Sequence, residues 1–189
     1  SGLTNFLMSK ADQCISLSET MAQNLNLKSK VIGHGVDPDW LTYDIKKRAT
    51  NPRKISVVGR IRKAKGQRDV MEAIAPLLSQ NPNWEIQFIG TIDRPAYADE
   101  ILVIAAAAQV ENQIQFVSQT NQIEHYYQES TAVVVASYSE GFSLVCIEAM
   151  ACGSTTVATE QVGIHSEVIT HGVDGFLYPK GSITALRTI

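Results

Sequence analysis

Short apolar runs alternate with helical patterns along most of this sequence. The runs are the length of buried strands, and they lie at 55–59, 85–89, 113–117, 132–136 and 155–158. Helical patterns separate and follow them, at 67–80, 95–109, 121–129, 143–152 and 165–171. Because parallel strands need crossover connections, this alternation predicts an α/β fold: a Rossmann-like, doubly wound parallel sheet with helices on both faces. Residues 175–178 are expected to add a sixth short strand.

The first 36 residues are expected to belong to a separate unit. They read as helix, strand, helix and strand, at 4–10, 13–17, 19–26 and 30–32. A turn with two glycines and a proline, Gly33 to Pro38, then makes a plausible hinge. We therefore predict a domain boundary there, with 1–36 as the tail of one domain and 37–189 as a second. The patterns begin and stop in mid-unit, so we expect a truncated chain.

Composition excludes several classes of function. The chain has 44% hydrophobic and 19% charged residues, and its net charge of −3 gives no support for a nucleic-acid surface. Its apolar runs are too short to span a bilayer. The three cysteines are an odd number without metal-ligand spacing, and Cys146 and Cys152 are expected to be small buried hydrophobes. A reducing, cytoplasmic location fits best.

A turn containing glycine and a carboxylate follows the apolar run 132–136. Its acidic residue is Glu140, and the glycine is Gly141. Because open α/β sheets bind ligands beyond the carboxyl ends of their strands, Glu140 is a candidate ligand-binding residue. From spacing alone, a solvated loop carboxylate is an equally good explanation.

The helix after this turn has readable ends and an unusual face. Ser143 is the expected N-cap and Gly153 the expected left-handed residue at the end. Positions 144, 147, 148 and 151 share one face, which we expect to point inward. Glu148 on that face must bind something, because an unpaired carboxylate is costly to bury. The alternative is that Glu148 reaches solvent or meets an arginine.

The two glutamates belong to a longer pattern. Glu140-Gly141-Phe142-Ser143-Leu144 and Glu148-Ala149-Met150-Ala151-Cys152-Gly153 resemble the Glu-x7-Glu motif of retaining, nucleotide-sugar-dependent glycosyltransferases of the group 1 type with the GT-B fold. The resemblance implies that residues 37–189 are the C-terminal, donor-binding half of that fold and 1–36 the tail of the acceptor half. It implies that Glu140 accepts hydrogen bonds from the donor sugar, that Glu148 holds the ribose, and that the donor also contacts Gly141, Phe142, Ser143 and Leu144.

A basic loop follows the run 55–59 and opens a helix. The sequence Gly59-Arg60-Ile61-Arg62-Lys63-Ala64-Lys65-Gly66 lacks the spacing of a Walker A loop or of G-x-G-x-x-G. It resembles the Gly-Arg-x5-Gly loop of the same glycosyltransferases, which implies that Gly59, Arg60 and Lys65 bind the donor diphosphate. Arg62 and Lys63 are more simply explained as solvated charges.

Other parts of the chain match the family less closely. Backbone contacts near Val117 are expected to hold the base, by resemblance alone. The family's Phe-Gly step is Phe142-Ser143 here, and its Gly-Gly-x-Pro-Glu element reads Val162-Gly163-Ile164-His165-Ser166-Glu167. These departures concern the loop next to the sugar. His165 and His171 are expected to be structural or exposed.

The resemblance implies a mechanism based on charge. When a sugar leaves a nucleoside diphosphate, negative charge grows on the β-phosphate, and fixed cations and helix N-terminal dipoles stabilise it. We expect Arg60, Lys65 and Glu140 to be catalytic, with a UDP- or GDP-linked sugar as substrate, no cofactor and no metal.

The expected activity is hexosyl transfer to a glycan or lipid-linked acceptor, in the manner of bacterial lipopolysaccharide-core mannosyl- or glucosyltransferases. The acceptor would bind through the missing N-terminal domain, so this fragment alone is expected to be inactive. The full-length enzyme is expected in the cytoplasm, with peripheral association at the inner face of a membrane. The alternatives are a nucleotide-sugar epimerase or phosphorylase of the same fold and a non-catalytic nucleotide-binding module.

Overall fold

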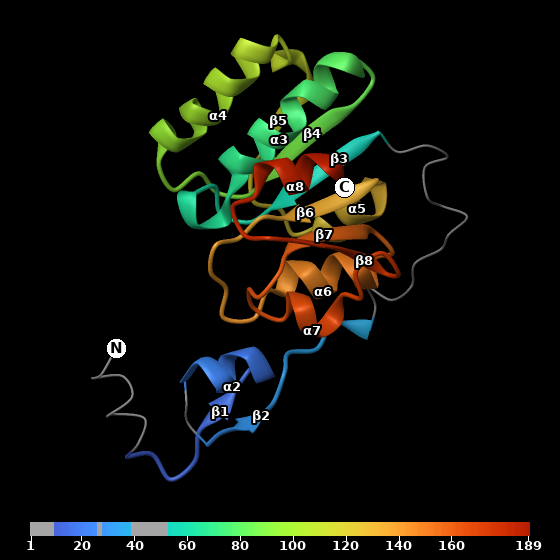
Figure 1. Ribbon diagram of the computed structural model, residues 1–189. Coiled ribbons are helices and arrows are strands. Elements are labelled where there is room, and N and C mark those ends of the chain that lie inside the picture. The colour runs from blue at the N-terminus through green and yellow to red at the C-terminus, as the bar shows by residue number, and fades with distance from the viewer. Residues whose placement is uncertain (1–9, 26–27, 39–52) are drawn as a thin grey trace.

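A six-stranded parallel sheet forms the centre of the molecule (Figure 1). The computed structural model describes residues 10–25, 28–38 and 53–189. The strand order is β5-β4-β3-β6-β7-β8. The strands are β3 (Lys54–Val58), β4 (Glu85–Ile89), β5 (Ile114–Val117), β6 (Ala132–Val135), β7 (Thr155–Thr159) and β8 (Gly175–Tyr178). All five predicted strands and the expected sixth are confirmed.

The order of the strands reverses at β3. From β3 the chain runs outward through β4 to β5, and then returns to place β6 on the other side of β3. Ile55 pairs with Ala132 and Ser56 with Val133 across this junction. In open α/β sheets such a reversal leaves a crevice beyond the carboxyl ends of the two strands, where ligands bind. The loops after β3 and β6 lie at that crevice.

Helices cover both faces of the sheet, so the doubly wound prediction is confirmed. One face carries α3 (Gln67–Gln80), α4 (Pro95–Ala108) and α8 (Ile183–Thr188), and its core includes Val70, Ile101 and Leu186. The other face carries α5 (Ile123–Glu129) and α6 (Leu144–Ala151), with Tyr127 and Cys146 in its core. Short helical turns complete the domain: η3 (Lys63–Lys65), η4 (Glu111–Gln113) and α7 (His165–Val168).

Helix α3 runs through a proline. Pro76 has no N–H to donate to the carbonyl of Glu72, four residues earlier, and so leaves that oxygen without its helical partner. Arg187 of α8 supplies the donors: Nη2 lies 3.0 Å from the carbonyl oxygen of Glu72, and Nε lies 3.2 Å from that of Ala73. The last described helix is thus fastened to the point where the proline interrupts α3.

The N-terminal part forms a small unit below the sheet in Figure 1. It contains β1 (Ile15–Ser16), α2 (Glu19–Leu25) and β2 (Lys30–Val31), with β1 and β2 paired in parallel. These three elements agree with the expected strand, helix and strand, whereas the expected helix at 4–10 lies outside the described residues. The division of the chain into two domains at residue 36 stays a prediction.

A carboxylate of the main domain holds the start of α2. Glu167, in α7, accepts hydrogen bonds from the backbone N–H groups of Glu19 and Thr20, at 3.2 and 2.9 Å, and from the Thr20 hydroxyl at 2.6 Å. The first N–H groups of a helix have no partner within it, so a carboxylate here satisfies them and complements the helix dipole.

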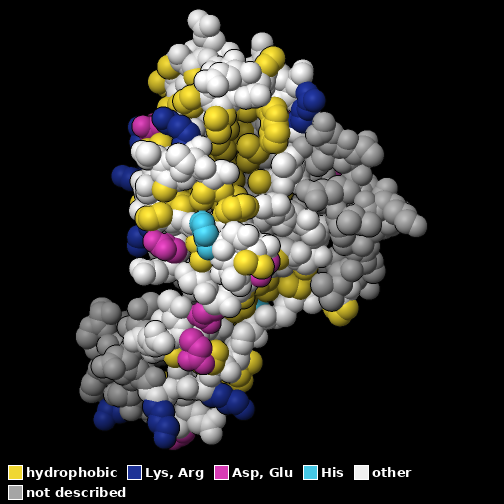
Figure 2. Space-filling view, turned by 45° about the vertical axis from the view of Figure 1, so that its right-hand side comes forward, with side chains coloured by type: hydrophobic (Ala, Val, Ile, Leu, Met, Phe, Trp, Pro, Cys, Tyr) yellow, Lys and Arg dark blue, Asp and Glu magenta, His cyan; other side chains and the backbone are white. Residues whose placement is uncertain are grey.

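Figure 2 shows hydrophobic side chains gathered on a face that lies away from the crevice. A hollow of about 410 Å³ between α3, α8 and the sheet is lined mostly by apolar side chains, among them Ile55, Leu77, Trp84, Phe176 and Ile189. Ile55 and Trp84 mark the amino ends of β3 and β4, so this hollow lies at the opposite end of the strands from the crevice. Among the described helices, none is long and apolar enough to cross a membrane.

Candidate functional site

The loops after β3 and β6 are in direct contact at the crevice. Gly66 has a φ of 68°, and a Cβ atom added to it would lie 2.2 Å from the carbonyl oxygen of Ala136, so only glycine fits. The backbone N–H of Tyr138 donates to the carbonyl of Ala64 at 2.9 Å. These contacts bring the basic loop and the acidic turn together, although some 75 residues separate them in the sequence.

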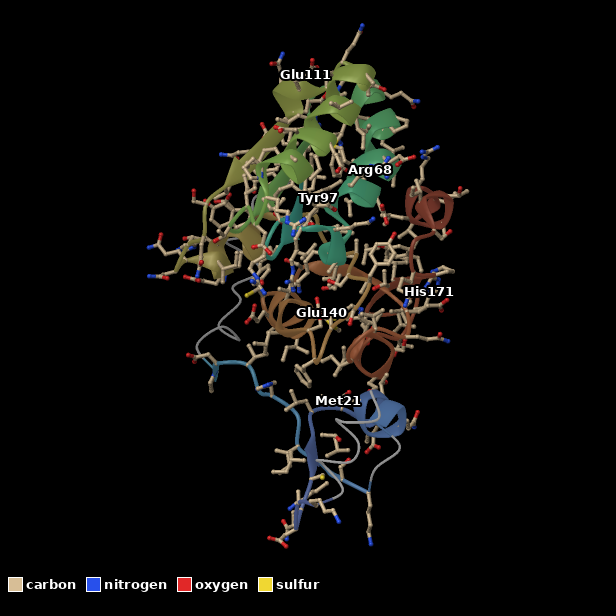
Figure 3. The ribbon with its side chains drawn as sticks, turned by 90° about the vertical axis from the view of Figure 1, so that its left-hand side faces the viewer. Met21, Arg68, Tyr97, Glu111, Glu140 and His171 are labelled. Atoms are coloured by element: carbon tan, nitrogen blue, oxygen red, sulfur yellow. The ribbon has the colours of Figure 1, made fainter. Side chains whose placement is uncertain are left out.

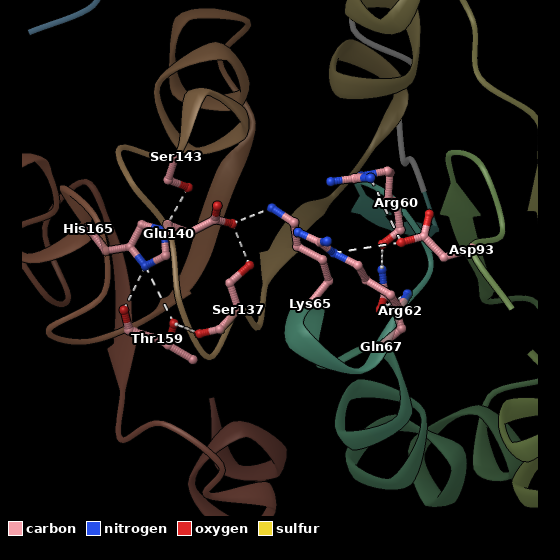
Figure 4. Close-up of polar contacts among 10 residues, drawn as sticks. All are labelled: Arg60, Arg62, Lys65, Gln67, Asp93, Ser137, Glu140, Ser143, Thr159 and His165. Carbon is pink, nitrogen blue, oxygen red and sulfur yellow. Dashed lines mark hydrogen bonds and ion pairs between the residues drawn. The ribbon is translucent and has the colours of Figure 1, made fainter. Parts of the chain in front are cut away.

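Lys65 and Glu140 form the central ion pair of this site (Figure 4). Lys65 Nζ lies 2.6 Å from Glu140 Oε1, and the hydroxyl of Ser137 donates to the same oxygen at 2.6 Å. The two side chains are only 18% and 14% exposed. The predicted proximity of Lys65 and Glu140 is therefore present in the structure, and Figure 3 shows Glu140 between the body of the domain and the N-terminal unit that carries Met21.

Arg60 belongs to the same loop but points toward a different carboxylate. Its Nη1 lies 3.9 Å from Asp93 Oδ2, and Arg62 Nε lies 4.0 Å from the same atom. The fully buried Gln67 holds this part of the loop: its Nε2 donates to the carbonyl of Arg60 at 2.9 Å, and its Oε1 accepts from the N–H of Arg62 at 3.4 Å. Asp93, near the end of the loop between β4 and α4, thus lies beside two arginines of the basic loop.

A hollow of about 360 Å³ opens beside the ion pair. It is lined by Leu17, His34, Lys65, Glu140, Phe142, Ser143, Leu144 and Val145. Two of these residues come from the N-terminal unit, and the ring of His34 packs edge-on against Phe142 with 5.0 Å between ring centroids. The hollow therefore joins the basic loop, the start of α6 and the N-terminal unit. Five of its lining residues, from Glu140 to Val145, are on the predicted motif or next to it.

The predicted role of Ser143 as a side-chain cap is wrong. Ser143 has a φ of 92° and its side chain makes no capping bond to α6. Its Oγ instead lies 2.8 Å from Nε2 of His165, which is fully buried. A capping serine has an extended backbone, which lets its hydroxyl accept from the first free N–H groups of the helix. The positive φ of Ser143 turns its hydroxyl away from those groups.

His165 is anchored on its other side as well. Its Nδ1 lies 2.7 Å from the carbonyl oxygen of Thr159, and the Thr159 hydroxyl donates to the carbonyl of Ser137 at 2.9 Å. Burial lowers the pKa of His165 below its ordinary value, so the neutral imidazole is favoured. The expectation that His165 is structural or exposed resolves in favour of a buried, hydrogen-bonded ring, whereas His171 is exposed.

The predicted inward face of α6 is also wrong. Cys146 and Ala149 are the fully buried residues of the helix, whereas Leu144 is 44% exposed. The helix packs against β7 and α5 along the side of Cys146 and Ala149 instead. Cys146 and Cys152 are buried, as expected, and none of the described cysteines forms a disulfide.

Glu148 is half-buried and held by a tyrosine. The hydroxyl of Tyr127, in α5, donates to Glu148 Oε2 at 2.8 Å. Burial raises the pKa of Glu148, and the hydrogen bond from Tyr127 acts in the opposite direction. The expected need for a partner is thus met by a tyrosine rather than an arginine. Glu148 is one turn along α6 from the residues that line the hollow beside Lys65.

The remaining predicted contacts lie around the same crevice. Gly59 has a φ of 135° and faces the stem of Lys65, while Gly141 is exposed at the turn before α6. Val117 ends β5, and its carbonyl accepts from the N–H of Gly90 at 2.9 Å. β5 is two strands away from β3, at the edge of the sheet. A role for Val117 in holding a base stays a prediction.

Several side chains that organise the site could not be found from the sequence. They hold other residues in place rather than carrying the motif, and they are Gln67, Asp93, Tyr127, Thr159 and His165. The signals were two departures from the family pattern: the Phe142-Ser143 step, on which His165 acts, and the element from Val162 to Glu167, which contains His165.

Comparison with known proteins places the chain in a family. The model of the family "Glycosyl transferases group 1" matches residues 40–188. A lipopolysaccharide core biosynthesis mannosyltransferase, LpsB of Rhizobium meliloti, is 32% identical over 181 residues, which cover 90% of this chain and 51% of the relative. The chain thus spans about half the length of the curated relatives it matches.

Solved structures agree with the fold. The C-terminal domain of a group 1 glycosyl transferase, LpcC of Francisella tularensis, is 28% identical with a TM-score of 0.71, and the match covers 82% of this chain and 85% of that one. HepE of Anabaena, in complex with UDP-glucose, is 23% identical with a TM-score of 0.85 over 99% of this chain and 55% of that one, a likeness of fold. By its sequence and its sheet, this chain belongs to the group 1 glycosyl transferases, with the fold of their GT-B members.

Proposed function

We propose that this chain is the donor-binding half of a retaining hexosyltransferase that uses a UDP- or GDP-linked sugar. The observation that carries the proposal is the contact between Lys65 and Glu140 at the junction of β3 and β6. A crevice at such a junction is where sheets of this type bind nucleotides. One cation and one carboxylate, both largely enclosed, suit a ligand with an anionic diphosphate next to neutral sugar hydroxyls.

The basic loop stabilises the leaving group in this proposal. As the bond between the sugar and the β-phosphate breaks, charge accumulates on the diphosphate, and Lys65 supplies a compact counter-charge. Arg60 adds a second cation from the same loop, positioned by its contact with Asp93. The N–H groups of Ser143, Leu144 and Val145, at the start of α6, add the positive end of a helix dipole. No metal is needed for this step.

The two glutamates bind hydroxyls. Glu140 accepts from the donor sugar once Lys65 turns toward the diphosphate, because a carboxylate can accept from two neighbouring hydroxyls. Glu148 accepts from the ribose with Oε1, since Oε2 already accepts from Tyr127. Glu140 and Glu148 then hold opposite ends of one nucleotide sugar.

The names of relatives suggest the acceptor. LpsB of Rhizobium meliloti is described as a lipopolysaccharide core mannosyltransferase, which supports a role for the whole protein in building lipopolysaccharide or another envelope glycan. We propose a glycan or lipid-linked acceptor bound mainly by a partner half outside this chain. We also propose a reducing compartment at the cytoplasmic side of a membrane, where Cys14, Cys146 and Cys152 would remain free thiols.

A donor screen tests the proposal. The full-length protein is incubated with UDP- and GDP-linked hexoses and with envelope glycan acceptors, and the product is analysed by NMR for the configuration at the transferred carbon. Transfer with retained configuration supports the proposal. Conversion of the donor to an epimer without transfer favours the epimerase alternative, and nucleotide binding without turnover favours a binding module. Both of the latter results contradict the proposed reaction.

A further inference from the structure

Ser143 occupies a backbone conformation that side chains rarely adopt. Its φ of 92° and ψ of 71° lie in the left-handed region. Most residues with a Cβ atom avoid this region, and glycine is the usual occupant. Ser143 is also buried, at the exact joint between the acidic turn and α6. A non-glycine residue in a strained conformation persists only where its surroundings hold it there.

The surroundings of Ser143 are dominated by His165. The carbonyl of Thr159 can only accept, so Nδ1 of the imidazole must carry the hydrogen that points to it. In the neutral ring Nε2 is then an acceptor, and the Ser143 hydroxyl donates to it at 2.8 Å. Figure 4 shows this chain of contacts, from Thr159 through His165 to Ser143. The charges of Glu140 and Lys65 act on the ring in opposite directions: Glu140 raises the pKa of His165 and Lys65 lowers it.

The joint sets the direction of the N–H groups that open α6. The carbonyl of Ser143 accepts from the N–H of Cys146 at 3.2 Å, which fixes the first turn of the helix. Ser143, Leu144 and Val145 all line the hollow beside Lys65. The N–H of Ile164 donates to the carbonyl of Phe142 at 2.9 Å. The segment that carries His165 therefore also binds the residue that precedes Ser143.

We propose that His165 is a positioning residue: its hydrogen bond to Ser143 holds the positive-φ joint that aims the first N–H groups of α6 at the donor diphosphate. This inference rests on the proposed function, because it assumes a diphosphate in the hollow beside Lys65. Ser143 contributes its backbone to the diphosphate, while its hydroxyl is committed to the imidazole. A glycine at position 143 would adopt the positive φ without strain. Serine adopts it at a cost, which its hydrogen bond to His165 offsets.

A double-mutant cycle tests the inference. Binding of UDP and of GDP to the 189-residue chain is measured by calorimetry for His165→Leu, Ser143→Gly and the double variant, with the melting temperature followed in parallel. We expect His165→Leu to weaken binding about tenfold in the parent background and less than about twofold in the Ser143→Gly background, because glycine adopts the joint without help. If His165 only fills the core, His165→Leu would weaken binding by the same factor in both backgrounds, and that result would overturn the inference.

A second pair of variants leaves His165 in place, in case its replacement prevents folding. Ser143→Ala keeps the strained Cβ atom and loses the hydroxyl, whereas Ser143→Gly loses both. The inference requires weaker nucleotide binding by Ser143→Ala than by Ser143→Gly, and equal or tighter binding by Ser143→Ala would contradict it. His171→Asn, at an exposed histidine, serves as the control for changes at a histidine outside the joint.

The effect of His165 on the backbone at the start of α6 can be measured in the absence of nucleotide. The amide NMR signals of Leu144 and Val145 are expected to shift on His165→Leu in the parent background and to stay in place when the same change is made on Ser143→Gly. Signals that move equally in both backgrounds overturn the inference. If the parent chain binds neither UDP nor GDP, the proposed function fails, whereas a failed cycle in a parent that binds overturns the inference alone.

Discussion

Tyr127 and Glu148 form a pair whose geometry bears directly on nucleotide binding. The tyrosine is fully buried in the core between α5 and α6, and its hydroxyl reaches the carboxylate of Glu148. A half-buried carboxylate has several rotamers, and a fixed donor selects one of them. In the proposed complex, Tyr127 therefore directs the unbound oxygen of Glu148 toward the ribose.

Removing this hydroxyl is expected to weaken nucleotide binding. Tyr127→Phe keeps the ring in the core and deletes the hydrogen bond that orients Glu148. Because a less ordered carboxylate binds the ribose less well, we expect the Kd for UDP or GDP to rise roughly two- to tenfold, or about 0.4–1.4 kcal/mol. The control is Tyr126→Phe, at the neighbouring, partly buried tyrosine. Calorimetry on both variants gives the answer, and an unchanged Kd for Tyr127→Phe would refute the positioning of Glu148.

At the scale of single residues, the sequence predicted the charged groups better than their supports. Lys65 and Glu140 stand in a recognisable pattern, and they meet in the structure. His165 and Tyr127 could not be assigned their roles, because each acts on a residue about 20 positions away through the fold. The positive φ of Ser143 could not be predicted for the same reason. Serine is a good N-cap, and only contacts with residues distant in the sequence exclude the extended capping conformation here.

A carboxylate of the main domain and a nearby hydroxyl share the start of α2: Glu167 accepts from the N–H groups of Glu19 and Thr20, and Ser18 Oγ accepts from the N–H of Met21 at 3.0 Å. Although burial alone would raise it, the pKa of Glu167 is lowered by the hydrogen bonds from Thr20 and Glu19. A carboxylate with a lowered pKa stabilises its contact above its ordinary pKa, and the contact is lost as the pH falls through the lowered value. The link between α2 and α7 is thus expected to weaken only under acid conditions.

An NMR titration tests this link. The amide signal of Thr20 should move with a midpoint below 4.5, the ordinary pKa of a glutamate. Glu167→Gln should abolish the movement, whereas Glu160→Gln, on a nearby loop, should leave it intact. A midpoint at or above the ordinary value would show that Glu167 does not cap α2.

Arg187 is expected to stabilise α3 at its proline. Arg187→Met keeps much of the apolar stem and removes the donors to the carbonyls of Glu72 and Ala73, at a cost of about 1 kcal/mol in the free energy of unfolding. Pro76→Ala restores the missing N–H of the helix, so the same arginine change should cost less in that background.

Urea denaturation of the two single variants and the double variant measures this coupling. Arg94→Met, at an exposed arginine, controls for the loss of a positive charge. Equal costs of Arg187→Met with and without Pro76 would show that the arginine does not serve the interrupted helix.

At the scale of elements, the periodicity of apolar residues predicted the limits of helices and strands well, but it predicted poorly which side of a helix is buried. The predicted helix at 67–80 and strand at 85–89 have the same limits in the structure. The inward face of α6 was predicted wrongly, because seven of its eight residues are apolar and therefore mark no distinct stripe. Contacts with β7 and α5 decide which side is buried, and those contacts are long-range.

For the molecule as a whole, the alternation of strands and helices was enough to predict a doubly wound parallel sheet. It could not by itself predict that β3 and β6 are neighbours, which is a matter of chain topology. The resemblance of two separate motifs to one family supplied that link, because it implies that a single nucleotide sugar contacts both. The central claim is accordingly that one diphosphate binds between the loop after β3 and the turn after β6.

Calorimetry of UDP and GDP binding to this chain and to two lysine variants tests that claim most directly. Lys65→Ala removes the cation that meets Glu140, whereas Lys63→Ala removes an exposed cation two residues earlier on the same loop. We expect Lys65→Ala to raise the Kd of the preferred nucleotide about tenfold, or ~1.4 kcal/mol, and Lys63→Ala to change it by less than about twofold. Equal losses in the two variants, or no binding by the parent chain, would contradict a diphosphate site between these loops.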